Sequence, residues 1–130
     1  MKSRIRVLMV LALVVMSGFE VPAQTPDTGR LMRLKLAHSQ KILEAILTSD
    51  FALLENESAA LAQATKLSAW SIFYSPEYNR QSGAFVRAVE DLRDAAMGRD
   101  LEGAASSYLS LTLTCFQCHR YIKNRRIAVR

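Results

Sequence analysis

Apolar side chains recur at helical spacing in four successive stretches of the chain, and no stretch shows the alternation typical of a strand. The first stretch follows Thr25-Pro26-Asp27, which supplies a cap and a proline at the first helical position. We expect this helix to end near Thr48-Ser49. Its apolar positions form two stripes, which comprise Leu31, Leu34, His38, Ile42 and Ala45 in one and Met32, Leu36, Leu43 and Leu47 in the other.

Three further helices are predicted beyond this first one. Asp50 caps a helix that runs to about Trp70, and residues 71–79 form the longest connection. The third helix ends at Gly98, which we expect in the left-handed conformation, and Asp100 opens a fourth helix that continues to about Arg126. The expected buried positions are Phe51, Leu54, Leu61, Ala64 and Leu67 in the second helix, Phe85, Val89, Leu92 and Ala96 in the third, and Leu101, Ala104, Ala105, Tyr108, Leu111 and Cys115 in the fourth. Four amphipathic helices joined by short links predict an all-α fold, an antiparallel up-and-down four-helix bundle.

Residues 1–23 have the layout of a cleaved secretory signal peptide. Three basic residues within the first six precede an uninterrupted apolar run at residues 7–16, and Val21-Pro22-Ala23 matches a cleavage site. A helix of this run spans roughly 15 Å, about half of a bilayer core. We therefore expect export to the periplasm, a folded domain at residues 24–130 and no stable membrane insertion after cleavage. A retained N-terminal anchor is the alternative.

The basic charge of the chain is concentrated in its C-terminal tail. The formal net charge is +5, and residues 120–130 hold Arg120, Lys123, Arg125, Arg126 and Arg130 but no acidic residue. The body of the domain is therefore close to neutral. A nucleic-acid-binding domain normally carries its basic residues over a face, so we expect no nucleic-acid partner.

Cys115-Phe116-Gln117-Cys118-His119 is the one specific motif of the sequence, because C-x-x-C-H is the pattern of a c-type haem attachment site. Two thiols three positions apart lie on one face of a helix and can form thioethers to the two vinyl groups of haem. The histidine that follows can bind the iron as an axial ligand. We therefore predict one haem c, attached through Cys115 and Cys118, with His119 on the iron.

Three other interpretations of the cysteines remain. The spacing also suits a structural disulfide in an oxidising compartment. A thioredoxin-like pair normally lies at the start of a helix that follows a strand, whereas this pair lies late in a long helix. A zinc site needs further ligands, and His38 is the only other histidine of the chain.

The expected bundle geometry suggests which residue faces the other side of the iron. His119 lies about 19 residues into the fourth helix, or roughly 28 Å from its start, and the same distance back along the first helix reaches about residue 30. Met32 is the candidate nearest that level, either bonded to the iron or only packed beside it. His38 lies roughly 9 Å further along. Met97 lies at the wrong end of the bundle, and Lys35 must lose its proton before it can bind iron.

The same level places the end of the second helix and the start of the third beside the cofactor. The expected pocket walls are Leu36, Leu67, Trp70, Tyr78 and Phe85. An apolar core cluster without a cofactor has the same composition. Arg30, Arg80 and the basic tail are candidates for pairing with haem propionates or for an exposed surface role.

In size, helix number and the position of its C-x-x-C-H motif, the chain resembles the cytochrome c′ family and its low-spin relatives. The resemblance covers about residues 27–126 and implies haem c held by Cys115, Cys118 and His119. It also implies a distal residue early in the first helix, which is apolar in five-coordinate members and methionine in low-spin members. Met32 matches that position if His38 is aligned with a histidine that some members carry six residues further on.

Two departures and one further expectation come with this resemblance. Many five-coordinate members have an arginine four residues after the haem histidine, where this chain has Lys123. A tyrosine is common directly before that arginine, where this chain has Ile122. These differences weaken any transfer of gas-binding chemistry on that side of the haem. Family members often dimerise through their first two helices, so a homodimer is a further expectation.

The leading functional hypothesis is a periplasmic electron carrier with His119 and Met32 as iron ligands, because a thioether and an apolar pocket favour reduced iron. The basic tail would steer docking onto an acidic surface of a redox partner protein. The alternatives are a five-coordinate protein that binds NO or CO beneath a Met32 lid, and a non-haem redox-thiol or helical interaction module. No arrangement of carboxylates or of Ser, His and Asp indicates an enzyme.

Overall fold

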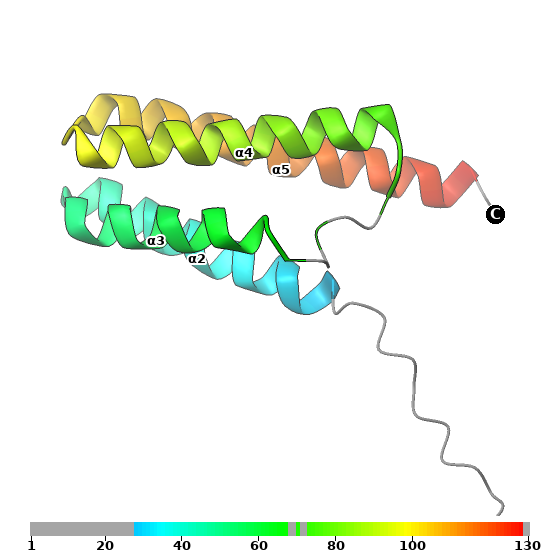
Figure 1. Ribbon diagram of the computed structural model, residues 1–130, viewed down its shortest axis with the longest axis horizontal. Helices are drawn as coiled ribbons and strands as arrows, with labels where there is room; N and C mark the ends of the chain where they lie inside the picture. Colours follow the sequence, from blue (N-terminus) through cyan, green and yellow to red (C-terminus); the bar gives the residue numbers. More distant parts are fainter. Residues whose placement is uncertain (1–27, 68–69, 71–72, 129–130) are drawn as a thin grey trace, which may run out of the picture.

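The computed structural model describes residues 28–67, 70 and 73–128, and these residues form four helices and no strand (Figure 1). The helices are α2 (Thr28–Thr48), α3 (Phe51–Ala64), α4 (Pro76–Met97) and α5 (Leu101–Ala128). The prediction of an all-α fold is confirmed for this part of the chain. The predicted signal peptide at residues 1–23 and the Thr25-Pro26-Asp27 cap lie outside it. Within the described residues, no helix combines the length and the apolar character needed to cross a membrane.

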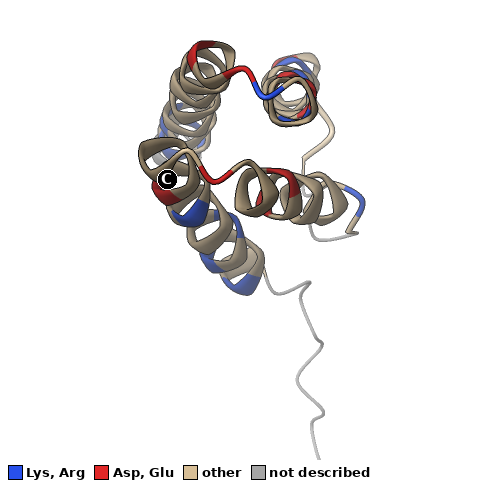
Figure 2. Cartoon of the chain, turned by 90° about the vertical axis from the view of Figure 1, so that its left-hand side faces the viewer, with Lys and Arg blue, Asp and Glu red and all other residues tan. Residues whose placement is uncertain are grey.

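The helices pack as two pairs that lie side by side (Figure 1). Helix α2 packs on α3, α4 packs on α5, and the two pairs meet mainly through α3 and α4. Helices α2 and α5 touch each other much less than these neighbours do. Seen end-on, the four helices surround a common interior, and the two tight turns lie at the same end of the molecule (Figure 2). This packing is compatible with a helical bundle.

The predicted helix starts at Asp50 and Asp100 are confirmed. The Asp50 carboxylate accepts a hydrogen bond of 2.9 Å from the backbone N–H of Leu53, and Asp100 accepts one of 2.9 Å from Gly103. Each carboxylate therefore satisfies one of the N–H groups that the first turn of a helix leaves without a partner.

The left-handed conformation predicted for Gly98 is wrong. Gly98 has a right-handed φ of −76°, and the next residue, Arg99, takes the positive φ of 52°. The Asp100 N–H donates to the carbonyl of Ala95 at 2.9 Å, which closes a Schellman turn whose left-handed residue lies one position beyond the cap. The turn between α2 and α3 is built in the same way, with a φ of 57° at Ser49.

The connection between the two helix pairs differs from the prediction at both ends. Helix α3 ends at Ala64, well before the expected end at Trp70, and its last turn is closed by backbone hydrogen bonds of Thr65. Helix α4 begins at Pro76, inside the stretch expected to be a connection. Ser75 caps α4 by accepting a hydrogen bond of 3.2 Å from the Tyr78 N–H, and proline suits the first turn because its missing N–H has no partner there.

The core lies between the four helices and contains the predicted apolar face of α4. The fully buried large side chains of the core are Ile42, Leu54, Leu61, Val89, Leu92 and Leu111. Two positions predicted as buried, Leu67 and Leu101, are exposed, and so are four apolar positions of the first helix, namely Leu34, Leu36, Leu43 and Leu47. Helix α2 carries apolar residues on more than one side, but only the side with Leu31, Ile42, Ala45 and Ile46 is buried.

Candidate functional site

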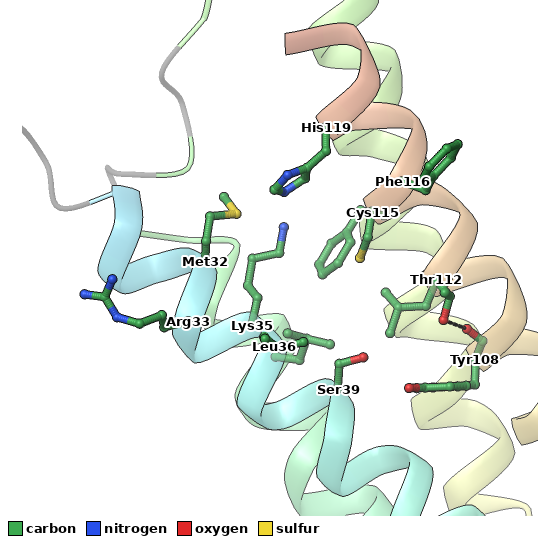
Figure 3. Close-up of a pocket in the computed structure, with 13 residues that line it drawn as sticks. Met32, Arg33, Lys35, Leu36, Ser39, Tyr108, Thr112, Cys115, Phe116 and His119 are labelled. Atoms are coloured by element: carbon green, nitrogen blue, oxygen red, sulfur yellow. Dashed lines mark hydrogen bonds between the residues drawn. The ribbon is translucent and has the colours of Figure 1, made fainter. Parts of the chain in front are cut away.

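A largely apolar pocket of about 600 Å³ lies between α2 and α5, where these two helices make few contacts. Leu61 of α3 and Phe85 of α4 also line it, and the Leu36 and Phe116 side chains that border it are exposed. Figure 3 shows Met32, Lys35 and Leu36 on α2 across from Cys115, Phe116 and His119 on α5. The volume lies within the roughly 300–1,000 Å³ that is typical of pockets for small organic ligands and cofactors.

The C-x-x-C-H motif lies just past the middle of α5 and presents its two cysteines and its histidine to this region. Cys115 and His119, one helical turn apart, line the pocket, and Cys118 lines an adjoining hollow of about 30 Å³ between α5 and α4. Both cysteines are free thiols and partly buried, whereas His119 is exposed. The helical register therefore brings both thiols and the imidazole to one end of the pocket.

Met32 lies on the opposite side of this space from His119. Both residues line the pocket and the adjoining hollow, and Figure 3 shows the Met32 side chain directed from α2 toward His119 on α5. A thioether and an imidazole, which are both ligands for haem iron, thus face each other from two helices. The structure brings together the two residues that the comparison of helix levels placed at the same height.

Lys35, one turn after Met32, extends its amine into the same space (Figure 3). The Lys35 Nζ atom lies 4.1 Å from the ring centroid of Trp70 and 4.1 Å from that of Phe85, and the two rings are 5.0 Å apart. Burial lowers the pKa of Lys35 below its ordinary 10.5, although negative charge on Cys115 or Cys118 would raise it. Sequence reasoning treated Lys35 only as a competing ligand. Its i+3 spacing from Met32 was the signal that it shares the pocket.

The two thiols lie in an environment that favours their neutral form. Burial raises the pKa of Cys115 and of Cys118 above 9.0, while the nearby Lys35 ammonium lowers both. Because burial dominates, both thiols are protonated at neutral pH.

Four of the five pocket walls predicted from the sequence line the pocket or the adjoining hollow, and Leu67 does not. Phe85 and Leu36 line the pocket, and Trp70, Tyr78 and Phe85 line the adjoining hollow. Leu67 lines neither space and is exposed. The reason is the early end of α3 at Ala64, which leaves Leu67 outside the helical register on which the prediction was based.

Gln81 of α4 lines the adjoining hollow and carries a buried hydrogen-bond acceptor. Its Nε2 atom donates to the Glu77 carboxylate at 2.7 Å, which accepts only, so the orientation of the amide is determined. The Gln81 Oε1 atom is buried and has no hydrogen-bond partner among the described residues. Leaving such an acceptor unpaired costs about 1–3 kcal/mol. Sequence reasoning missed Gln81, since no local pattern distinguishes it.

His38 and Arg80 each have a carboxylate partner: His38, which the sequence placed roughly 9 Å from the level of the iron, is partly buried, and Arg80, for which a propionate partner or an exposed surface role was expected, lies on the exposed side of α4. His38 Nδ1 lies 2.6 Å from Glu57 Oε2 and is absent from the pocket lining, and Lys41 donates to the other carboxylate oxygen at 3.2 Å. Burial raises the pKa of Glu57, but these two hydrogen bonds outweigh it and leave the pKa below 4.5. Arg80 forms a two-pronged ion pair with Glu77, at 2.9 and 2.7 Å, on the exposed side of α4.

Comparison with protein-family models, with curated proteins and with solved structures finds no match to the chain. Within the described ranges, no group of three or more His, Cys, Asp and Glu side chains is arranged to hold a metal ion.

Proposed function

We propose that this chain is a periplasmic c-type haem protein that transfers electrons through one covalently attached haem. The observation that carries the proposal is the apolar pocket between α2 and α5, with Cys115 and His119 on one side and Met32 on the other. The proposal includes an antiparallel up-and-down arrangement of the four helices. The two tight turns at one end of the molecule and the successive packing of α2 on α3, α3 on α4 and α4 on α5 support this arrangement.

The residues present fit a haem in size and in chemistry. Cys115 and Cys118 would hold it by thioether bonds, and His119 and Met32 would bind the iron from α5 and α2. When bound, the haem supplies an iron atom that takes up and releases one electron. Leu61, Phe85 and Leu111 are buried and line the pocket, so they would exclude water from the cofactor and favour the reduced state.

Gln81 offers a role beyond the iron ligands. A histidine that binds a metal through one ring nitrogen normally donates a hydrogen bond from the other, which orients the ring. Gln81, whose buried Oε1 atom has no partner among the described residues, lines the same hollow as His119. Gln81 is therefore suited to accept this hydrogen bond.

Lys35 competes with Met32 for the distal position. Its amine lies in the same pocket, and burial favours the neutral form that can bind iron. Met32 remains the proposed ligand because its thioether needs no loss of a proton.

Three basic residues follow the motif on α5, namely Arg120, Lys123 and Arg125. They would steer an acidic redox partner toward the haem histidine.

The test begins with expression alongside the machinery that attaches haem in the periplasm. Mass spectrometry of the purified protein is expected to show a mass increase of one haem, which is lost in a Cys115→Ser/Cys118→Ser variant. A chain without added mass, with free or disulfide-bonded cysteines, would contradict the proposal and support a non-haem redox or interaction module.

Absorption spectra of three variants then identify the distal ligand. We expect a low-spin spectrum that Met32→Leu converts to high spin, while Lys35→Leu, which removes the amine without adding a ligand, leaves it low-spin. Met97→Leu is the matched control, because Met97 lies at the exposed end of α4, away from the pocket. A resting protein that is high-spin, binds CO without losing a ligand and has the same spectrum in Met32→Leu would contradict electron transfer. It would support gas binding beneath a Met32 lid.

A further inference from the structure

Helix α5 carries a second apolar surface that is separate from its buried face. Leu109, Leu113 and Phe116 are 66%, 58% and 64% exposed, although Ala104 and Leu111 on the same helix are fully buried. A single exposed leucine is ordinary, but a contiguous apolar row on a helix marks a contact surface. These three residues lie at spacings of four and three, so they form one continuous stripe along α5.

A charged residue lies beyond each end of this stripe, and together they follow a seven-residue repeat. Glu102, Leu109, Phe116 and Lys123 are each seven positions apart, and Leu113 lies one turn beyond Leu109. Seven residues make almost two helical turns, so these side chains share one side of α5 over roughly 32 Å. We call this set, Glu102, Leu109, Leu113, Phe116 and Lys123, the α5 seam. All five side chains are exposed.

The α5 seam is complementary to itself when it is reversed in direction. Leu109 and Phe116 are equally far from the point between Thr112 and Leu113, and so are Glu102 and Lys123. In an antiparallel pair of α5 helices, Leu109 lies opposite Phe116 of the partner subunit, and Glu102 lies opposite Lys123 of the partner subunit. No ion pair within the described part of the chain engages Glu102 or Lys123.

We propose that two copies of this chain associate through the α5 seam, antiparallel, about a two-fold axis near Leu113. A two-fold dimer uses the same patch on both copies, so the patch must be complementary to itself. The order of acidic, apolar and basic residues along the α5 seam meets this requirement. The parallel arrangement would place like charges opposite each other at both ends of the seam. This interface is on the last helix, so it differs from the dimer through the first two helices that the family resemblance implies.

The α5 seam overlaps the lining of the pocket only at Phe116. Phe116 belongs both to the seam and to the border of the pocket, so association covers part of that border. The Arg120 guanidinium lies 5.9 Å from the Phe116 ring centroid, yet most of the ring stays exposed. The partner subunit would therefore cover apolar surface that the chain leaves in contact with water.

Sedimentation equilibrium of the purified protein over a range of concentrations tests the proposal. We expect a reversible monomer–dimer equilibrium, and Leu113→Glu should raise the dissociation constant at least tenfold because it places two carboxylates near the axis. Leu47→Glu is the matched control, since Leu47 is an exposed leucine of α2 outside the seam. Circular dichroism verifies that both variants are folded. A protein that stays monomeric at all concentrations, or a dimer that Leu113→Glu leaves intact or that Leu47→Glu weakens equally, overturns the proposal.

A charge reversal tests the antiparallel register. Glu102→Lys and Lys123→Glu should each weaken association about tenfold, because each creates two like-charged contacts across the two-fold axis. The double variant Glu102→Lys/Lys123→Glu restores opposite charges and should recover the wild-type dissociation constant within about twofold. A double variant that is weaker than either single variant would overturn the register.

Discussion

Lys35→Met is the substitution that most directly tests the description of the pocket. In the haem-free protein, the Lys35 ammonium lies against Trp70 and Phe85, with no carboxylate partner in the described part of the chain. Methionine has a similar length and volume and retains the apolar contacts of the side chain. The substitution therefore removes the buried charge and little else.

Two opposing effects determine the size of the change. Loss of the contacts between the ammonium and the two rings removes about 1–2 kcal/mol of attraction. Burial nevertheless lowers the pKa of Lys35, so the site disfavours the charged form relative to water. Replacing buried ionic groups by apolar residues stabilises proteins by about 1–4 kcal/mol, and Lys35 belongs near the middle of this range, at about 2–3 kcal/mol, because its partly buried ammonium has no carboxylate partner among the described residues. We expect Lys35→Met to raise the free energy of unfolding at pH 7 by about 1 kcal/mol, or the melting temperature by about 4–8 °C.

The pH dependence follows from the direction of the pKa shift. The folded pKa of Lys35 lies below the 10.5 of the unfolded chain. Between these two values the unfolded chain binds more protons, so the stability of the wild-type protein rises with pH. The advantage of Lys35→Met should therefore be largest at neutral pH and shrink as the pH rises toward 10.5. Urea unfolding of haem-free protein, followed by circular dichroism at several pH values, measures both quantities.

Two controls separate this effect from a general loss or gain of charge. Lys66→Met removes an exposed lysine just after α3 and should change the free energy of unfolding by less than about 0.5 kcal/mol. Lys35→Arg keeps a charge that cannot be lost, so it should lack the stability gain toward alkaline pH. A wild-type protein that is more stable than Lys35→Met at pH 7, or a difference that does not change with pH, would refute the reasoning.

Two further predictions concern the hydrogen bonds of Glu57 and the packing of the core. Glu57→Gln should lower the free energy of unfolding by about 1.5–3 kcal/mol at pH 7, because Glu57 accepts charge-assisted hydrogen bonds from His38 and Lys41. The pKa of Glu57 lies below 4.5, so its contribution is present above that pH and is lost as the pH falls; urea titrations that give equal losses at pH 7 and pH 3 would contradict this. Leu92→Ala removes a fully buried side chain away from the pocket and should cost about 3 kcal/mol in the same assay, whereas a cost below about 1 kcal/mol would show a loosely packed core.

Some helix boundaries could be predicted from local sequence signals, and others could not. Asp50 and Asp100 were predictable caps, because a capping side chain bonds to backbone groups only three residues away. The start of α4 was equally local, and Ser75-Pro76 was a readable signal for it. The end of α3 was not predictable in this way. Apolar spacing continues to Leu67, but the chain turns after Ala64 to reach the next helix pair.

The burial pattern required the tertiary structure. Both α2 and α5 have apolar residues on more than one side; the face predicted as buried in α5 is largely confirmed, with Leu101 as the exception, but periodicity did not decide between the two apolar stripes of α2. In α2 the buried side contains Ile42, while Leu36 and Leu47 remain exposed. In α5 it contains Leu111, while the α5 seam remains exposed. The answer depends on how each helix is rotated about its own axis against its neighbours.

By itself, the sequence determined the helical character of the chain and the presentation of Cys115, Cys118 and His119 on neighbouring positions of one helix, because both follow from local backbone periodicity. Only the tertiary structure decided that Met32 and Lys35 face this motif across an open space and that His38 pairs with Glu57 instead. These relations join residues on different helices. The open space depends on the sparse contact between α2 and α5, and the His38–Glu57 pair depends on the close packing of α2 on α3; both are properties of the packed helices and of no single segment.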